Sequence, residues 1–194
     1  MHLFFSKEIS GTHAFLPEDE SLHAIKVLRL SENSEIGVID GHGGYYHCKI
    51  IKPHAKRCEL QIIKQEQHQW QRPRYVHIAI APTKNSDRIE WFVEKAVEIG
   101  IDKITFLQCE RSERKSMNMD RTERVALAAL KQSQQYFIPE MIDMMPFKAF
   151  IESHKDMKNK YIGHLHANDR KNLSKEVHDK DNILILIGPE GDFS

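Results

Sequence analysis

The strongest constraint on the fold is an uninterrupted apolar run, Ile183 to Ile187, that passes directly into Gly188-Pro189-Glu190-Gly191-Asp192-Phe193-Ser194. Five consecutive β-branched or leucine residues predict a strand buried on both faces, as in a parallel sheet covered by helices. Ligands of such sheets bind beyond the carboxyl ends of the strands, where this turn must lie. Gly188 and Gly191 have no Cβ, so a ligand can approach the backbone there. The turn is therefore either a ligand-binding turn or a tight strand-to-helix turn, with Asp192 or Ser194 capping the next helix.

Upstream of this run, strand and helix patterns alternate from Tyr75 onwards, which predicts a mainly parallel α/β sheet. We expect strands at 75–81, 101–108, 161–165 and 183–187. Two helices are expected between them. The first is capped by Asp87, closed by Gly100 and amphipathic at Ile89, Phe92, Val93, Ala96 and Val97. The second starts at a capping-box pattern, Asp120 with Glu123, and runs to about Tyr136.

The first third of the chain has short strand patterns and one helix, which predicts a small β-barrel. Strands are expected at 3–5, 35–40, 45–51 and 57–64. Pro17 opens a helix at Glu18, with Leu22, Ile25 and Leu28 on one face. The glycine cluster 41–44 lies between two strands, so it is a hairpin turn and not a dinucleotide-binding fingerprint. The polar stretch 65–74 is the expected linker, which gives one domain at 1–68 and another at 75–194.

The composition is that of an ordinary globular protein and gives no hint of a nucleic-acid partner. The 28 Lys+Arg residues balance the 28 Asp+Glu residues, so any RNA contact must come from a local basic patch. No apolar stretch approaches the ~20 residues that a membrane span needs. The three cysteines lack paired ligand spacing, and His164 with His166 lacks an evident third ligand, so no metal site is predicted. We expect a cytoplasmic protein that does not contact a membrane.

Residues 187–194 resemble the signature of the RsmE family, SPOUT-class methyltransferases that act on ring nitrogen 3 of a uridine in 16S ribosomal RNA. The resemblance extends along the chain through 23–29, Lys84, 88–91, 95–100, 111–114, 131–133 and 138–139. Two positions depart from the family pattern, Asp192 where glycine is common and Lys131 where an acid is common. The resemblance implies a SPOUT-type sheet with helices on both faces, behind a PUA-like or OB-like barrel. Family chains continue into a segment that threads a trefoil knot, so we expect this chain to be C-terminally incomplete.

The resemblance also implies the cofactor, the partners and the site residues. S-adenosylmethionine would bind, largely through backbone groups, at Leu165, His166, Ile187, Gly188, Pro189, Glu190 and Gly191. The small ribosomal subunit would be contacted by Lys26, Arg29, Lys84, Arg111 and Arg114. Lys26 and Arg29 are three residues apart and would share one helix face, which suits phosphate contacts. A homodimer is expected. No catalytic residue is assigned.

Two other functional classes stay open. A noncatalytic RNA-binding protein of ribosome assembly would use the same basic residues, and the turn at Gly188 would then be structural. An α/β enzyme with a nucleotide cofactor is disfavoured, because the glycine cluster does not open a helix. Binding of S-adenosylmethionine separates the methyltransferase from the RNA-binding protein, and binding of a dinucleotide would support the second alternative.

Overall fold

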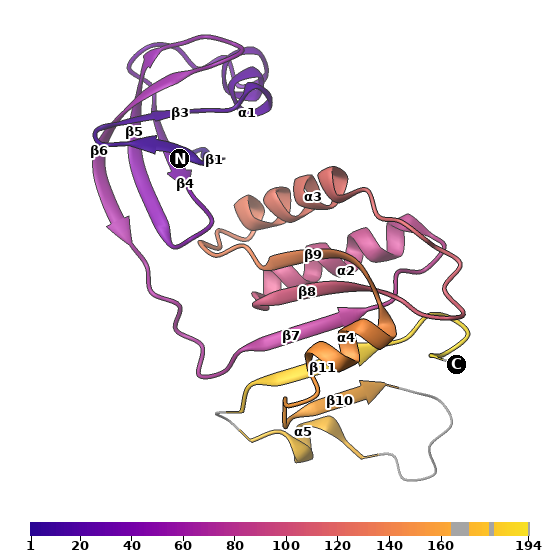
Figure 1. The fold of residues 1–194 in the computed structure, drawn as a ribbon. Coiled ribbons are helices and arrows are strands. Elements are labelled where there is room, and N and C mark those ends of the chain that lie inside the picture. The colour runs from indigo at the N-terminus through magenta and orange to yellow at the C-terminus, as the bar shows by residue number, and fades with distance from the viewer. Residues whose placement is uncertain (164–170, 179–180, 194) are drawn as a thin grey trace. The chain divides into compact units, whose positions relative to one another are not determined.

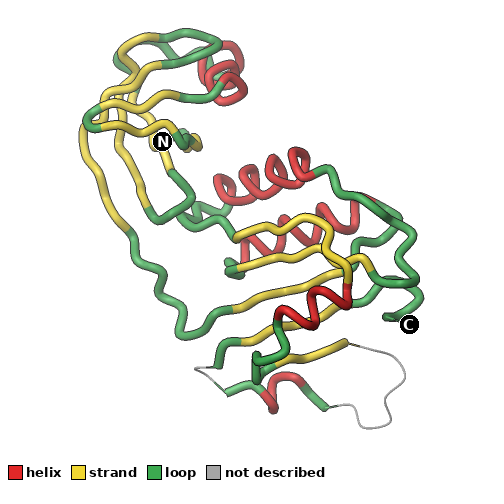
Figure 2. The backbone as a smooth tube through the Cα atoms, in the orientation of Figure 1, coloured by secondary structure: helices red, strands yellow, loops and turns green. Residues whose placement is uncertain are grey.

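The computed structural model describes residues 1–163, 171–178 and 181–193. Its chain divides into two compact units (Figures 1 and 2). Unit 1 comprises Met1–Trp70 together with Leu130–Ile138, and unit 2 comprises Gln71–Ala129 together with Pro139–Ser194. None of the helices in the described ranges is long and apolar enough to cross a membrane.

Unit 1 is built on a curled sheet of six strands, which confirms the predicted strand-rich domain (Figure 1). In spatial order the strands are β1 (Leu3–Phe5), β4 (Glu35–Ile39), β5 (Gly44–Lys52), β6 (Glu59–Gln67), β3 (His13–Phe15) and β2 (Glu8–Ser10). Only the pair β1–β4 is parallel. The three-residue strands β2 and β3 were not predicted, because they are too short to show an alternating pattern. Strand β6 continues to Gln67 and so takes up the first residues of the expected linker.

The predicted helix of unit 1 is a short α-helix, α1 (Glu18–Leu22), followed by a π-helical turn, η1 (His23–Val27). Ala24 is buried, and Ile25 and Leu28 pack against the core of the curled sheet. Leu22 was expected on the same face, but half of its surface is exposed. That prediction was wrong because the hydrogen bond from Leu28 N to His23 O spans five residues and changes the helical spacing.

The glycine cluster is the predicted hairpin turn between β4 and β5, and it also receives a distant segment of the chain. Gly43 has a φ of +94°, and a Cβ there would lie 2.5 Å from the carbonyl oxygen of His68 and 2.6 Å from the Phe137 ring. The backbone of residues 136–138 pairs with this turn, through Gly43 N to Tyr136 O at 2.9 Å and Ile138 N to Gly41 O at 3.0 Å. Glycine is therefore needed both for the turn and for this close approach.

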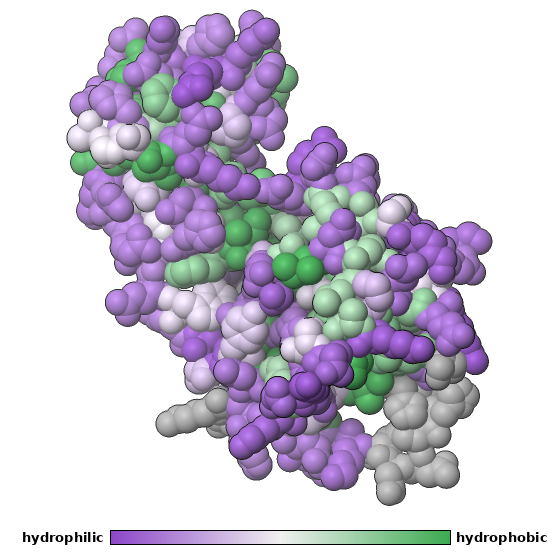
Figure 3. Space-filling view, in the orientation of Figure 1, coloured by the Kyte–Doolittle hydropathy of each residue, from purple (hydrophilic) through white to green (hydrophobic). Residues whose placement is uncertain are grey.

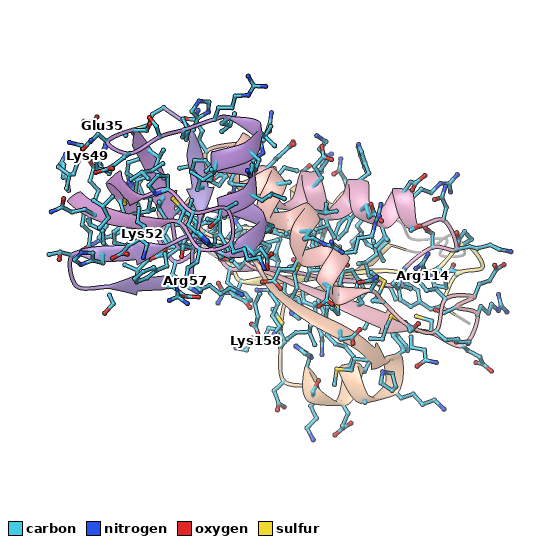
Figure 4. All side chains as sticks on the ribbon, turned by 90° about the horizontal axis from the view of Figure 1, so that it is seen from above. Glu35, Lys49, Lys52, Arg57, Arg114 and Lys158 are labelled. Carbon is cyan, nitrogen blue, oxygen red and sulfur yellow. The ribbon has the colours of Figure 1, made fainter. Side chains whose placement is uncertain are left out.

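Within its described residues, unit 2 contains a sheet of five strands whose pairings are all parallel, which confirms the predicted mainly parallel sheet. Their spatial order is β10 (Lys160–Gly163), β11 (Ile183–Ile187), β7 (Val76–Ile80), β8 (Lys103–Gln108) and β9 (Glu140–Pro146). The helices of this part of the chain are α2 (Ser86–Ile99), α3 (Met119–Gln132), α4 (Phe147–Ser153) and α5 (Leu173–Glu176). Helices α2 and α4 lie on opposite faces of the sheet (Figures 1 and 4). The two-sided covering explains why Ile183, Leu184 and Leu186 are all buried.

At the start of each of the helices α2 and α3, more than one residue of the sequence could form the N-terminal cap. Asn85 caps α2, since its side chain accepts a hydrogen bond from Asp87 N at 2.8 Å, so the predicted cap at Asp87 is wrong. Asn118 accepts from Arg121 N at 3.0 Å and has the same role for α3, in place of Asp120. In both cases several cap-forming residues are adjacent, and only the backbone path selects between them. Gly100 ends α2 with a φ of +79°, as expected.

Strand β9 and helix α4 were not predicted. The sequence of β9, Glu140–Pro146, has no strict alternation, and its burial pattern is mostly intermediate because it forms the edge of the sheet. Helix α4 has only seven residues. Its Phe150 is fully buried against residues of the sheet such as Ala79 and Leu107. Tertiary packing, rather than a periodic pattern, therefore stabilises this part of the chain.

Unit 1 contains a buried ion pair at the second position where the chain departs from the family pattern. Glu20 of α1 is 5% exposed and accepts a hydrogen bond from Nζ of Lys131. Its other oxygen, Oε2, has no hydrogen-bond partner among the described residues. Burial raises the pKa of Glu20, and the charge of Lys131 opposes that change. Lysine at position 131 is thus matched by an acid at position 20.

We predict that Lys131→Met lowers the free energy of unfolding by about 3 kcal/mol, because it leaves a buried carboxylate without its partner. The double variant Glu20→Leu/Lys131→Met should recover to within about 1 kcal/mol of the original protein, since apolar residues replace buried pairs at little cost. Urea unfolding measures both values. Lys155→Met is the control, because Lys155 forms an exposed pair with Glu152 and should cost less than about 1 kcal/mol. Equal losses for Lys131→Met and Lys155→Met would contradict the prediction.

His77 is a buried titratable group in the centre of the sheet of unit 2. It is 2% exposed, its Nε2 is 2.8 Å from the hydroxyl of Thr105, and its ring packs edge-on against Phe150. Burial lowers the pKa of His77 to about 4, with further contributions from the positive charges of His154 and Lys103. At neutral pH the imidazole is therefore neutral in the folded protein.

Because the pKa of His77 is lower in the folded than in the unfolded state, acid favours unfolding. The contribution of neutral His77 to the free energy of unfolding is fully present above about pH 6.5, the pKa of histidine in the unfolded state. This contribution is lost as the pH falls towards 4. We expect a loss of about 2 kcal/mol between pH 7.5 and pH 5, measured by urea unfolding. His77→Gln should flatten this dependence although it lowers stability at pH 7.5. His2→Gln, at an exposed site, should leave the dependence as it is. An unchanged slope in His77→Gln would rule out His77 as its source.

Candidate functional site

The strand order of unit 2 places the turn after β11 at a topological switch point. From β7 the chain proceeds outward to β8 and β9, and it then returns on the other side of β7 as β10 and β11. Strand β11 lies between β10 and β7, and Ala81 N donates to Ile187 O at 2.9 Å just beyond the paired residues. Open α/β sheets bind ligands outside the carboxyl ends of the strands at this kind of position.

The turn itself, residues 188–193, is compact. Asp192 N donates to Pro189 O at 3.0 Å, and a Cβ at Gly188 would lie 2.9 Å from the ring of Phe193. Phe193 packs in turn against Phe147 of α4, with ring centroids 5.2 Å apart. Pro189 and Asp192 are buried, whereas Glu190 and Gly191 are exposed. Gly188 is therefore required for packing beneath the turn, while the exposed side of the turn is open to a ligand.

The backbone conformation of Asp192 explains why aspartate is tolerated at this position, where the family commonly has glycine. Its φ is +65°, in the left-handed region that glycine adopts without strain and that aspartate tolerates better than most residues. Its side chain accepts a hydrogen bond from Phe193 N at 2.9 Å. The alternative role that the sequence left open for Asp192, capping a following helix, stays a prediction.

Five of the seven residues predicted to bind the cofactor lie together in this turn or at the strand end that leads into it. Ile187 is the last residue of β11 and is 36% exposed, and Gly188, Pro189, Glu190 and Gly191 follow it. Leu165 and His166 lie outside the described residues, as does the His164 that was considered with His166 as a metal ligand pair. Within the described ranges no three His, Cys, Asp or Glu residues are grouped so that they could hold a metal ion.

The residues predicted to bind RNA are divided between the two units. Lys26 lies on η1 of unit 1, and Lys84, Arg111 and Arg114 lie on loops of unit 2. Arg29 comes after the end of η1 and has a φ of +55°, so it does not continue the helix. The expectation that Lys26 and Arg29 share one helix face is therefore wrong, although both side chains are exposed.

Arg111 and Arg114 are already engaged with backbone oxygens. Arg111 Nη1 donates to Gly191 O at 2.8 Å, within the turn after β11. Arg114 donates from Nε to Thr83 O at 3.0 Å and from Nη2 to Lys84 O at 2.8 Å, within the loop after β7. Both arginines come from the segment between β8 and α3. This segment thus joins the two loops that flank the switch point.

Sequence analysis missed Ser112, which closes the base of the segment between β8 and α3. Ser112 is 3% exposed, and its Oγ accepts a hydrogen bond from Cys109 N at 3.0 Å. Ser112 N donates back to Cys109 O at 3.2 Å. Burial raises the pKa of the Cys109 thiol, so this cysteine is protonated at neutral pH and does not act as a nucleophile. No signal in the sequence distinguishes Ser112 from an exposed loop serine.

A cavity of about 350 Å³ opens between α2 and α3, near the start of each helix. The residues that line it include the apolar Ile89, Val93 and Met117 and the basic Arg114 and Arg121. Arg121 makes two hydrogen bonds to Glu90, at 2.5 and 2.8 Å, and this partner lowers the pKa of Glu90. Among the described residues, those of the turn after β11 do not line this cavity.

Family models match both parts of the chain. Residues 70–194 match an RNA methyltransferase domain, and residues 16–63 match the PUA domain of RNA methyltransferases. Among characterised proteins, the ribosomal RNA small subunit methyltransferase E of Buchnera aphidicola is 24% identical over 98% of this chain and 77% of its own length. The protein of the same name in Bacillus subtilis is 21% identical over 89% of this chain and 72% of its own length.

Solved structures agree with the family models. A probable rRNA methyltransferase from Porphyromonas gingivalis is 34% identical and superposes with a TM-score of 0.88, covering 100% of this chain and 82% of that one. A ribosomal RNA small subunit methyltransferase E from Neisseria gonorrhoeae, solved with bound S-adenosylmethionine, has a TM-score of 0.86 at 21% identity. It covers 100% of this chain and 82% of that one.

The close contact between Gly188 and the ring of Phe193 predicts that a side chain at position 188 destabilises the protein. Gly188→Ala should lower the free energy of unfolding by about 1 to 2 kcal/mol, because the added methyl group collides with the Phe193 ring. Gly163→Ala is the matched control, since Gly163 ends the neighbouring strand β10 and, among the described residues, its Cβ would meet Leu186 O alone, at 3.8 Å. Guanidinium unfolding of both variants measures the difference. A neutral Gly188→Ala would show that Phe193 does not pack against this turn.

Proposed function

Since the chain belongs to the RsmE family of RNA methyltransferases, we propose that it methylates ring nitrogen 3 of a uridine in the 16S ribosomal RNA of the small subunit. The methyl donor is S-adenosylmethionine. Methylation of ribosomal RNA is the activity named in the characterised relatives. The names of these relatives do not state the nucleotide or the ring atom, so uridine and its nitrogen 3 are the part that we propose.

The observation that carries the proposal is the position of the turn at residues 188–193. It follows β11, which is inserted next to β7, and so it lies where an open α/β sheet binds its ligand. The turn is held from two sides, by Ala81 N on Ile187 O and by Arg111 on Gly191 O. A cofactor site needs such fixed geometry, because methyl transfer depends on the alignment of donor and acceptor.

The residues of the turn fit S-adenosylmethionine chemically. Ile187 offers an exposed apolar side chain for the adenine ring, and Gly191 offers exposed backbone without a Cβ. Glu190 is exposed and offers a carboxylate, which can accept hydrogen bonds from ribose hydroxyls or from an ammonium group. We therefore assign Ile187, Gly188, Pro189, Glu190 and Gly191 to the cofactor site, together with Leu165 and His166.

When bound, S-adenosylmethionine supplies a methyl group on a sulfonium, which is intrinsically reactive. The protein then has to align the acceptor nitrogen and to accommodate loss of the imide proton. The turn and the loop after β7 provide the alignment, and we assign no residue as the base. Burial keeps Cys109 protonated, so a covalent thiol intermediate forms no part of the proposal.

We propose that domain 1–68 binds RNA and that domain 75–194 carries the methyltransferase site. Since the net charge is zero, RNA contacts have to come from local groups, and Lys26, Arg29 and Lys84 are exposed candidates. The visible face of unit 1 is mainly hydrophilic (Figure 3), and Lys49, Lys52 and Arg57 lie on this unit (Figure 4). Arg57 already pairs with Glu8 at 2.7 Å. A homodimer in the cytoplasm is the proposed working form.

The proposal predicts that the protein transfers labelled methyl from S-adenosylmethionine to small ribosomal subunits that lack the modification. Digestion of the RNA to nucleosides, followed by chromatography and mass spectrometry, should recover the label as 3-methyluridine. Ile187→Asp should raise the KM for S-adenosylmethionine about tenfold or more, because it places a charge against the adenine site. Ile151→Asp is the matched control, since Ile151 is also 36% exposed but lies on α4.

Three outcomes would count against the proposal. Label in another nucleoside would retain the methyltransferase and reject the uridine N3 position. Binding to the subunit without methyl transfer would favour the noncatalytic RNA-binding protein. Equal KM values for Ile187→Asp and Ile151→Asp would remove the turn from the cofactor site.

A further inference from the structure

The segment between β8 and α3 contacts two loops at the carboxyl edge of the sheet in unit 2, the turn after β11 and the loop after β7. It is closed at its base by the paired hydrogen bonds of Cys109 and Ser112, at 3.0 and 3.2 Å. Because Ser112 is 3% exposed and Cys109 is also 3% exposed, this base is part of the buried interior. The two hydrogen bonds therefore fix the backbone that carries Arg111 and Arg114.

Arg111 reaches from this segment to the turn after β11. Its Nη1 donates to Gly191 O at 2.8 Å. A Cβ at Gly191 would lie 3.3 Å from Arg111 Cδ and 3.5 Å from Arg111 Cβ, so the two residues are in close contact. One guanidinium group thus restrains the carbonyl of Gly191, next to Glu190.

Arg114 reaches in the other direction, to the loop after β7, and lies among the loops at one end of unit 2 (Figure 4). Its Nε and Nη2 donate to consecutive carbonyls, Thr83 O at 3.0 Å and Lys84 O at 2.8 Å. The neighbouring Glu113 pairs with Lys84 Nζ at 3.1 Å. The loop after β7 is therefore fixed at its backbone by a planar guanidinium that presents two donors at once.

We propose that Arg111 and Arg114 are positioning residues of the cofactor site, which hold the turn after β11 and the loop after β7 in the binding geometry. This inference rests on the proposed function, since it takes the turn to be the binding site for S-adenosylmethionine. It replaces the role that the sequence suggested for both arginines, a direct contact with RNA phosphates. The hydrogen bonds of the two guanidinium groups go to backbone carbonyls of the protein itself, Gly191 O for Arg111 and Thr83 O and Lys84 O for Arg114.

The two roles differ in what they predict for the protein without RNA. A positioning residue affects the binding of S-adenosylmethionine before any RNA is present. A phosphate contact leaves that binding unchanged and lowers the slope of log K for RNA against log salt by about 1. A residue that only stabilises the fold lowers the thermal midpoint and changes neither binding constant at a temperature well below unfolding.

The experiment is calorimetric titration of S-adenosylmethionine into the RNA-free protein, with RNA binding measured at several salt concentrations. Arg111→Ala should weaken cofactor binding about tenfold, as expected for loss of a charged hydrogen bond, and should leave the RNA salt slope unchanged. Arg111→Gln should recover part of the affinity, because its amide can still donate to Gly191 O although it has no charge. Arg114→Ala should also weaken cofactor binding while leaving the RNA salt slope unchanged.

Arg124→Ala is the matched control. Arg124 is exposed on α3 and donates to the carbonyl of Asp120 in its own helix, at 3.3 Å, so it changes the net charge equally without touching either loop. Unchanged cofactor affinity in Arg111→Ala, with a lower RNA salt slope or only a lower thermal midpoint, would overturn the inference alone. Failure of the original protein to bind S-adenosylmethionine would overturn the proposed function and this inference with it.

Discussion

The structure of unit 2 depends on the parallel pairing of its last strand with its first. Strand β11 pairs with β7 over five residues, from Ile183 with Val76 to Ile187 with Ile80, although more than 100 residues separate them in the sequence. Strand β11 therefore lies between β10 and β7, and the glycine-containing turn that follows it lies at the switch point of the sheet. Apolar burial on both faces of β11 stabilises the pairing, so the site is positioned by the core rather than by its own contacts.

Polar contacts then set the local geometry around this strand. Backbone carbonyls at the edge of the sheet are satisfied by arginines from the segment between β8 and α3, and Ser112 satisfies a buried amide in the same segment. A buried amide without a partner is costly, which accounts for the contact of Ser112, and each arginine contact restrains the loop whose carbonyl it binds. The same residues that complete the backbone hydrogen bonds therefore shape the proposed cofactor site.

Glu20 in unit 1 and His77 in unit 2 show how this protein accommodates a titratable side chain in its core. Glu20 remains in the core of unit 1 because Lys131 reaches it, and this pairing accounts for a lysine where the family commonly has an acid. His77 remains in the core of unit 2 because burial keeps it neutral and Thr105 provides a hydrogen-bond partner. Neither role was visible in the sequence, since each depends on residues that are distant along the chain.

The sequence by itself determined the parts that follow from local pattern. The five-residue apolar run predicted β11, the i, i+3, i+4 spacing predicted α2, and the glycines at 41, 43 and 100 predicted the hairpin turn and the helix end. The signature at residues 187–194 predicted the family to which the chain belongs. These signals are local because strand burial, helix periodicity and positive φ act on neighbouring residues.

Only the tertiary structure decided the rest. It placed β9 at the edge of the sheet, selected Asn85 and Asn118 over nearby acidic residues as helix caps, and exposed Leu22 through a π-helical turn. It also directed Arg111 and Arg114 towards backbone carbonyls that lie 80 and about 30 residues away in the sequence. Contacts of this kind are set by which strands become neighbours, and no periodicity or composition of the chain encodes that choice.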